Sequence, residues 1–124
     1  DIKTIPNVRT YVAIDGGMYE NPRYALYQSD YTCLIANKAN EPADFTATIA
    51  GKCCESGDLI QENTLIQKPE VGDILAVLST GAYNYSMASN YNRNTRPPVV
   101  IVRGGESRVI IKGETYEDLV RNDV

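Results

Sequence analysis

The sequence predicts an all-β fold, a Greek-key-type barrel or sandwich of about six to eight short strands with a few short helices. Short runs rich in β-branched residues recur along the chain, and clusters of Gly, Pro, Asn and Asp separate one run from the next. The segments that favour a helix are all short. With 124 residues, the chain is expected to form one domain over residues 1–124, large enough to bury a core.

Turn residues set the boundaries of the predicted strands. Residues 8–14 are rich in β-branched side chains and stop at Asp15-Gly-Gly17, and residues 45–50 alternate apolar residues with threonine. A Gly-Gly pair within residues 103–108 separates two apolar runs, which is typical of a hairpin. In chain order, we expect strands at residues 8–14, 31–36, 45–50, 59–60, 64–67, 74–78, 99–102 and 109–111, with a loop at 37–44 and a turn at 68–73.

Three other segments favour irregular or helical structure. Residues 21–27 are compatible with a single helical turn, and residues 82–91 with a short helix or a structured loop. Thr115 followed by Asp118 indicates an N-cap for a last short helix that ends at Asn122.

Composition and charge exclude several classes of function. The net charge of -4 leaves no excess of Lys and Arg to bind a nucleic-acid backbone, and no apolar run reaches the length of a membrane span. The sequence has no His, which excludes Ser-His-Asp and Cys-His catalysis and any His-ligated metal. Three cysteines form a poor disulfide framework, so we expect free thiols and a cytoplasmic protein. They are Cys33, Cys53 and Cys54.

The segment Gly51-Lys-Cys-Cys-Glu-Ser-Gly-Asp58 concentrates reactive groups directly after a predicted strand. Glycines near both ends indicate a tight turn or a close approach of the backbone to another group. A loop at the end of a strand often presents catalytic side chains. A surface turn with two incidental cysteines is the alternative, and composition alone leaves both interpretations open.

Three segments that follow one another along the chain favour the catalytic interpretation. They carry a resemblance to one enzyme family that covers nearly the whole chain. Matches at Asp15-Gly-Gly-Met18 and Arg96-Pro-Pro98 flank them. The segments are Asn21-Pro-Arg23 with Ala25-Leu-Tyr27, then Gly51-Lys-x-Cys54-Glu-Ser-Gly-Asp58, then Gly81-Ala-Tyr83 with Tyr85-Ser86 and Ser89-x-Tyr91-Asn92. The chain resembles the C-terminal β-barrel domain of the diaminopimelate decarboxylases, which are pyridoxal-phosphate enzymes with the alanine-racemase-like fold (fold type III).

This resemblance implies a two-domain enzyme of which only the C-terminal domain is present here. The missing domain is a TIM barrel that holds pyridoxal 5'-phosphate on a lysine, and the family's active site lies between the barrel of one subunit and the β domain of its homodimer partner. The chain starts at Asp1 without a Met, which also suggests a fragment. We therefore expect the isolated chain to be inactive, and the full-length protein to convert meso-2,6-diaminopimelate to L-lysine and carbon dioxide.

The resemblance also assigns roles to five residues. Cys54 matches the proton donor, and Glu55 matches the acid that receives the distal ammonium of the substrate. Arg23 and Tyr27 match residues that bind a substrate carboxylate, and Tyr83 matches one that contacts the cofactor phosphate and lines the substrate site. A thiol is mostly protonated near neutral pH, and the adjacent Glu55 disfavours the thiolate, as an acid requires.

Two other readings stay open from the sequence. One is a decarboxylase of the same fold that acts on carboxynorspermidine, ornithine or arginine. The pairing of Arg23 with Glu55 argues against ornithine and arginine, because neither substrate has a distal carboxylate. The other is a β domain that only binds or oligomerises and performs no chemistry.

Overall fold

The computed structural model describes all 124 residues and places eight strands in three sheets. The predicted all-β class is confirmed, although the strand ladders do not join the three sheets into one closed ring. The largest sheet has the order β1-β2-β4-β5, and the remaining strands form the pairs β3-β6 and β7-β8. The strands are β1 (Ile2–Ile5), β2 (Arg9–Ala13), β3 (Cys33–Ile35), β4 (Phe45–Ala50), β5 (Leu59–Ile66), β6 (Leu75–Val77), β7 (Val99–Arg103) and β8 (Glu106–Ile111).

The helices are short, as the sequence predicts. All except the last helix, which follows the last strand, lie in the connections between sheets. Thr115 caps the last helix, where its hydroxyl accepts the Asp118 N–H at 3.3 Å and the Asp118 carboxylate accepts the Thr115 N–H at 2.9 Å. None of the α-helices has the length and hydropathy needed to cross a lipid bilayer. The helices are α1 (Arg23–Tyr27), η1 (Ala36–Lys38), α2 (Asn84–Met87), η2 (Tyr91–Arg93) and α3 (Tyr116–Val120), where η marks a 3-10 helix.

The core lies between the four-stranded sheet and the β3-β6 pair. Cys33 belongs to this core, and burial raises the pKa of its thiol to about 11, so Cys33 is a structural residue. The other buried members are apolar or small residues from β2, β3, β4 and β5: Val12, Ile35, Ala47, Ile49, Ile60 and Ile66.

Two strands differ from the prediction. Residues 2–5 form β1, which the sequence analysis missed, and a turn with Asn7 at φ 61° returns the chain to β2. β5 is one continuous strand rather than two short ones. Its polar residues do not interrupt it, because Gln61 accepts the Tyr31 N–H at 3.0 Å and Glu62 pairs with Arg9.

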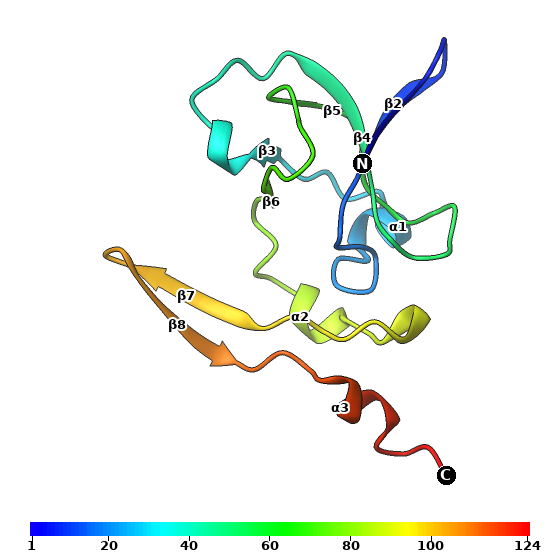
Figure 1. Cartoon of the computed structure of the whole chain (residues 1–124), viewed down its shortest axis with the longest axis vertical. Helices are drawn as coiled ribbons and strands as arrows, with labels where there is room; N and C mark the ends of the chain where they lie inside the picture. Colours follow the sequence, from blue (N-terminus) through cyan, green and yellow to red (C-terminus); the bar gives the residue numbers. More distant parts are fainter.

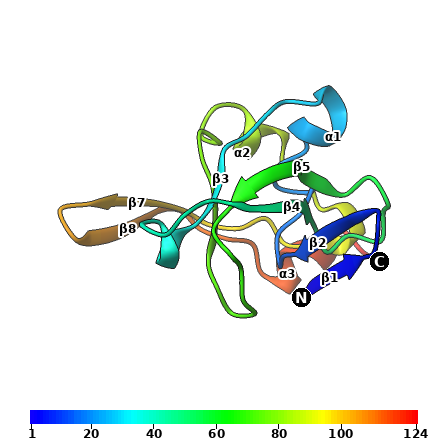
Figure 2. The ribbon, with the colours of Figure 1, turned by 90° about the horizontal axis from the view of Figure 1, so that it is seen from above.

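The C-terminal part of the chain extends away from the large sheet. Figures 1 and 2 show the β7-β8 hairpin projecting from the body of the molecule, with α3 following it. The hairpin is paired only with itself in the strand ladders, and several of its apolar side chains are exposed.

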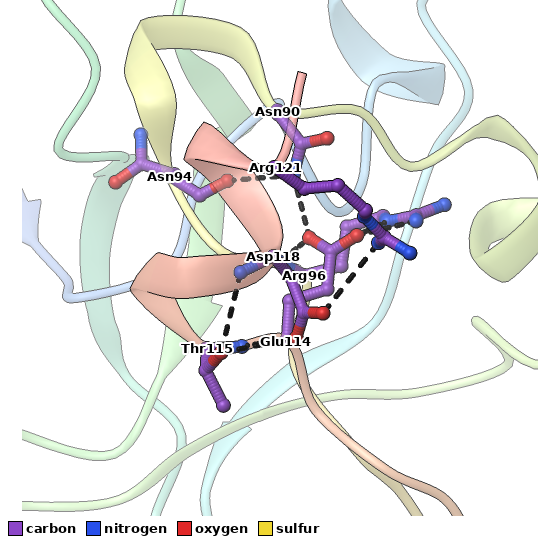
Figure 3. A network of polar contacts seen from close by, with 7 residues as sticks. All are labelled: Asn90, Asn94, Arg96, Glu114, Thr115, Asp118 and Arg121. Atoms are coloured by element: carbon purple, nitrogen blue, oxygen red, sulfur yellow. Dashed lines mark hydrogen bonds and ion pairs between the residues drawn. The ribbon is translucent and has the colours of Figure 1, made fainter. Parts of the chain in front are cut away.

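Glu114 holds this C-terminal part to the segment that follows α2. Its Oε1 accepts the Arg96 Nε–H at 2.8 Å, and its Oε2 accepts the Arg96 backbone N–H at 2.8 Å and an Asn90 side-chain N–H at 2.5 Å. Figure 3 shows this carboxylate between the two side chains. The Arg96 guanidinium is the main cause that lowers the pKa of Glu114 from its ordinary 4.5 to about 2.

We predict that Glu114→Gln lowers the free energy of unfolding of this chain by about 1 to 2 kcal/mol at pH 7. A carboxyl whose folded pKa is depressed stabilises the fold above its unfolded pKa of about 4.5. The difference from the wild type should therefore be constant above pH 5 and shrink as the pH falls towards about 2. Urea unfolding across this pH range measures it.

Glu106→Gln is the matched control, because the Glu106 side chain, at the hairpin turn, makes no hydrogen bond or ion pair. This control should leave the unfolding free energy within about 0.5 kcal/mol of the wild type. A Glu114→Gln difference that persists unchanged at low pH would contradict the assignment.

Candidate functional site

Two loops meet at one edge of the large sheet because β2 and β4 run parallel. Parallel strands end at the same edge, so the segment after β2 and the segment after β4 emerge side by side. Backbone hydrogen bonds continue the contact beyond the strands. The Ile14 N–H donates to the Ala50 carbonyl at 2.9 Å, and the Lys52 N–H donates to the Gly16 carbonyl at 3.0 Å.

The Asp58 carboxylate joins these two loops. Its side chain is almost fully buried, and the residue is 2% exposed. Oδ1 accepts the Met18 N–H at 2.6 Å, and Oδ2 accepts the Cys53 N–H at 2.7 Å. Hydrogen bonds to an ionised group are stronger than neutral ones, and a buried charge without them would be costly. Asp58 therefore shapes both loops through hydrogen bonds from its side chain to the backbone.

Glycine is required where the backbone passes over this carboxylate. A Cβ atom at Gly51 would lie 2.2 Å from Asp58 Oδ2, and one at Gly17 would lie 2.8 Å from the same oxygen. The close backbone approach that the sequence predicts is therefore present at Gly51. Gly57 differs, because its Cβ position would meet only Glu55 Oε1, at 3.6 Å.

The two adjacent cysteines have opposite environments. Cys53 is buried, and its Sγ accepts an Asn94 side-chain N–H at 3.7 Å. Burial, followed by the hydrogen bond with Asp58, raises the pKa of the Cys53 thiol. Cys54 is exposed, and its backbone N–H donates to Asn92 Oδ1 at 2.7 Å. All cysteines are free thiols, as expected, and only Cys54 presents its thiol at the surface of the loop.

Glu55 lies at the outer turn of the same loop and is exposed. Its Oε1 accepts the Gly57 N–H at 3.0 Å, which leaves further lone pairs of the carboxylate available. Tyr91 lies close to it: burial raises the pKa of the Tyr91 phenol, and the charge of Glu55 raises it further. A thiol, a carboxylate and a phenol are thus close together beside the loop.

The three predicted substrate residues outside this loop form a second group. The Arg23 guanidinium carbon lies 5.4 Å from the ring centre of Tyr27 and 5.0 Å from that of Tyr83. The contact with Tyr27 agrees with the expected helical turn, which puts residues four apart on one face. Arg23 also approaches Met87 Sδ at 4.0 Å, but it makes no hydrogen bond to oxygen and no ion pair.

Both aromatic residues of this group are well exposed, Tyr27 by 61% and Tyr83 by 66%. Tyr83 has the backbone angles φ 72° and ψ -39°, which are unfavourable for a non-glycine residue. Strain of this kind is found most often at functional sites. The backbone at Gly81, two residues before Tyr83, is open, because no atom lies within 4 Å of its Cβ position.

A polar network that the sequence analysis missed anchors α1 to the sheet. The buried Tyr24 donates its hydroxyl to Glu62 Oε2 at 2.7 Å, and Arg9 pairs with the other oxygen of Glu62. The hydrogen bond with Glu62 raises the pKa of Tyr24 to about 12. Tyr24 follows Arg23 directly, and adjacent residues of a helical turn point in different directions, so Tyr24 is buried while Arg23 is half-buried. The position of Tyr24 next to Arg23 was the only feature of the sequence that could have indicated this network.

No hydrogen bond or ion pair joins the Cys54-Glu55 group to the Arg23-Tyr27-Tyr83 group, so the structure brings the five predicted residues into two neighbouring sets. A cleft of about 290 Å³ lies between α1 and the segment of residues 84–91. Met87, which contacts Arg23, and Tyr91, which lies near Glu55, both line this cleft.

Comparison with known proteins places the chain in a family. The profile of the family described as "Pyridoxal-dependent decarboxylase, C-terminal sheet domain" matches residues 1–81. The chain belongs to this family. The resemblance that the sequence motifs indicate is therefore confirmed, including the predicted sheet domain.

Individual relatives are similar over almost the whole chain. Diaminopimelate decarboxylase of Bacillus subtilis is 53% identical over 122 residues, which is 98% of this chain and 28% of the relative. The Bacillus methanolicus enzyme of the same name is 56% identical over 110 residues, 89% of this chain and 26% of the relative. The crystal structure of diaminopimelate decarboxylase from M. jannaschii in complex with L-lysine superposes with a TM-score of 0.90 at 36% identity, over 100% of this chain and 28% of that chain. This chain thus spans less than a third of the proteins it matches.

We predict that Gly51→Ala destabilises the fold by about 2 kcal/mol or more, because its Cβ would collide with the buried Asp58 carboxylate. Gly57→Ala, in the same loop, is the matched control and should change the unfolding free energy by less than about 0.5 kcal/mol. Urea unfolding of the two variants measures the effect. Equal losses in both would mean that the loop does not depend on close packing around Asp58.

Proposed function

We propose that this chain is the C-terminal domain of a cytoplasmic, homodimeric carboxy-lyase that converts meso-2,6-diaminopimelate to L-lysine and carbon dioxide with pyridoxal 5'-phosphate. Support comes from membership of the pyridoxal-dependent decarboxylase family and from relatives named diaminopimelate decarboxylase at about 50% identity. In this proposal the reaction belongs to the full-length protein, and the chain described here is inactive alone.

The main structural support for the proposal is that the Arg23 guanidinium has no carboxylate partner within the chain. This guanidinium lies against two tyrosine rings but has no carboxylate or carbonyl partner. A guanidinium offers five N–H donors in a planar fork that matches a carboxylate bidentately. The two rings favour the cation and limit its orientation. Arg23 is therefore prepared to bind a carboxylate supplied by a ligand, with the Tyr27 hydroxyl as a second donor.

Glu55 can bind the positively charged ammonium at the far end of the substrate. The far end of meso-diaminopimelate is itself an amino acid, with one carboxylate and one ammonium group. Arg23, which is half-buried, would bind the carboxylate, and the exposed Glu55 would bind the ammonium. Ornithine and arginine lack a distal carboxylate and would leave Arg23 without its partner, which is the physical basis for excluding them.

Cys54 is the group of this chain that can return a proton to carbon. It is the exposed member of the cysteine pair and a free thiol, whose S–H group can donate a proton. Decarboxylation replaces a carboxylate on carbon by a hydrogen, so a donor must lie beside that carbon. The buried Cys53 cannot reach a substrate, so the proposal gives it no chemical role.

One residue of this chain, Tyr83, fits a role in binding pyridoxal phosphate. When bound, this cofactor withdraws the electrons that the departing carbon dioxide leaves on the substrate. The exposed Tyr83 hydroxyl can donate one hydrogen bond to a phosphate oxygen without adding charge. The remaining contacts, including the lysine that holds the cofactor, belong in this proposal to the TIM-barrel domain. The exposure of Tyr27 and Tyr83 beside Arg23 suits a site completed by a partner subunit.

We predict that Arg23→Lys in the full-length protein lowers kcat/KM for meso-diaminopimelate about 100-fold, because an ammonium cannot bind the carboxylate bidentately. Arg103→Lys, on the exposed hairpin, is the matched control and should retain kcat/KM within about twofold. Steady-state carbon dioxide release measures both. If Arg23→Lys kept wild-type kcat/KM, Arg23 would not be the carboxylate ligand.

Cys54→Ala should lower kcat far more than it changes KM, because proton return belongs to the chemical step rather than to substrate binding. We expect a loss in kcat of at least about 100-fold. Cys53→Ala serves as the comparison, since it removes a neighbouring thiol that is buried. Similar losses of kcat in the two variants would contradict the assignment of Cys54.

A further inference from the structure

Asn92 contacts the loop of residues 51–58, which carries Cys54 and Glu55. It lies in η2, and its side-chain Oδ1 accepts the backbone N–H of Cys54 at 2.7 Å, across 38 positions of sequence. The backbone of Asn92 has φ 54° and ψ 27°, in the left-handed region. Asn tolerates this region better than most residues, so its backbone and its side chain both suit the position.

The segment that carries Asn92 is held in place on both sides. Before it, the Asn90 side chain donates to Glu114 at 2.5 Å and to the Asn94 carbonyl at 3.0 Å. After it, Arg93 forms an ion pair with Asp123 at 2.8 Å. The Asn92 carboxamide therefore projects from a turn that is tied to the C-terminal part of the chain.

Hydrogen bonds hold the peptide groups around Cys54. The Cys53 N–H is bound by the buried Asp58 carboxylate at 2.7 Å, and the Cys54 N–H by Asn92 at 2.7 Å. The Glu55 N–H donates to the Cys53 carbonyl at 2.8 Å, which holds the peptide group after Cys54. Because the peptide groups before and after Cys54 are both held, the backbone of Cys54 and the direction of its Cα–Cβ bond are fixed. The thiol itself makes no hydrogen bond within the chain.

We infer that Asn92 is a positioning residue that directs the Cys54 thiol towards the reacting carbon. This inference rests on the proposed role of Cys54 as the proton donor. Asn92 does not touch the substrate in this account, and it acts only through the Cys54 backbone. Because a small error in the placement of a catalytic group costs rate rather than affinity, the loss of this hydrogen bond should appear in kcat.

Two substitutions separate the hydrogen bond from the backbone conformation. Asn92→Gly keeps the left-handed backbone and removes the acceptor, whereas Asn92→Asp keeps both the acceptor and a tolerance for this region. In the full-length protein, Asn92→Gly should lower kcat about tenfold with KM changed less than about twofold. Asn92→Asp should recover most of the lost kcat. Asn7→Gly is the matched control, because Asn7 is an exposed asparagine at φ 61° in the β1-β2 turn, far from the loop in sequence.

Amide hydrogen exchange at Cys54 reports on the contact independently of activity. Exchange of this amide should accelerate in Asn92→Gly and stay near the wild-type rate in Asn92→Asp and Asn7→Gly. The inference is overturned if Asn92→Gly speeds exchange but retains wild-type kcat, or if Asn92→Asp loses as much kcat as Asn92→Gly.

Cys54→Ser tests the proposed function in the same experiment. If Cys54→Ser retains wild-type kcat, Cys54 is not the proton donor, and the proposed function of this residue fails together with the positioning role. If Cys54→Ser loses kcat and Asn92→Gly does not, the proposed function stands and only the inference about Asn92 fails.

Discussion

The structure depends on one buried carboxylate. Asp58 lies between the segments that follow two parallel strands, and it binds one backbone N–H from each of them. A buried anion without such donors would be strongly unfavourable, so the two loops cannot separate without a large cost. Gly17 and Gly51 leave the space that the carboxylate fills. The arrangement of everything at this edge of the sheet follows from that interaction.

The candidate site is built outward from this anchor and from two smaller ones. Asp58 and Asn92 hold the backbone of the cysteine pair. The hydrogen bond from Tyr24 to Glu62 anchors α1, the helix that carries Arg23, to the sheet. Asp58 and Tyr24 are buried, whereas the second cysteine of the pair is exposed and Arg23 is half-buried. The domain thus presents a thiol, a carboxylate, a guanidinium and phenols on a rigid support, which is the form expected of one half of a shared active site.

Most of this arrangement could be predicted where local signals are strong. β4, the C-terminal hairpin and the Thr115 cap follow from alternation, a Gly-Gly turn and capping chemistry, and the motif around Cys54 indicated the family. The parts that could not be predicted depend on long-range partners. β5 is continuous because Gln61 and Glu62 find partners on distant elements, and the role of Asn92 depends on a residue 38 positions away. The opposite burial of Cys53 and Cys54 likewise depends on tertiary packing.

Carbon dioxide release by the full-length protein tests the central claim most directly. The substrates to compare are meso-diaminopimelate, carboxynorspermidine, ornithine and arginine, in the presence of pyridoxal 5'-phosphate. The account predicts turnover of meso-diaminopimelate and negligible turnover of the other three, because Arg23 requires a distal carboxylate and Glu55 a neighbouring ammonium. Comparable turnover of ornithine or arginine would contradict it, since neither substrate can occupy Arg23.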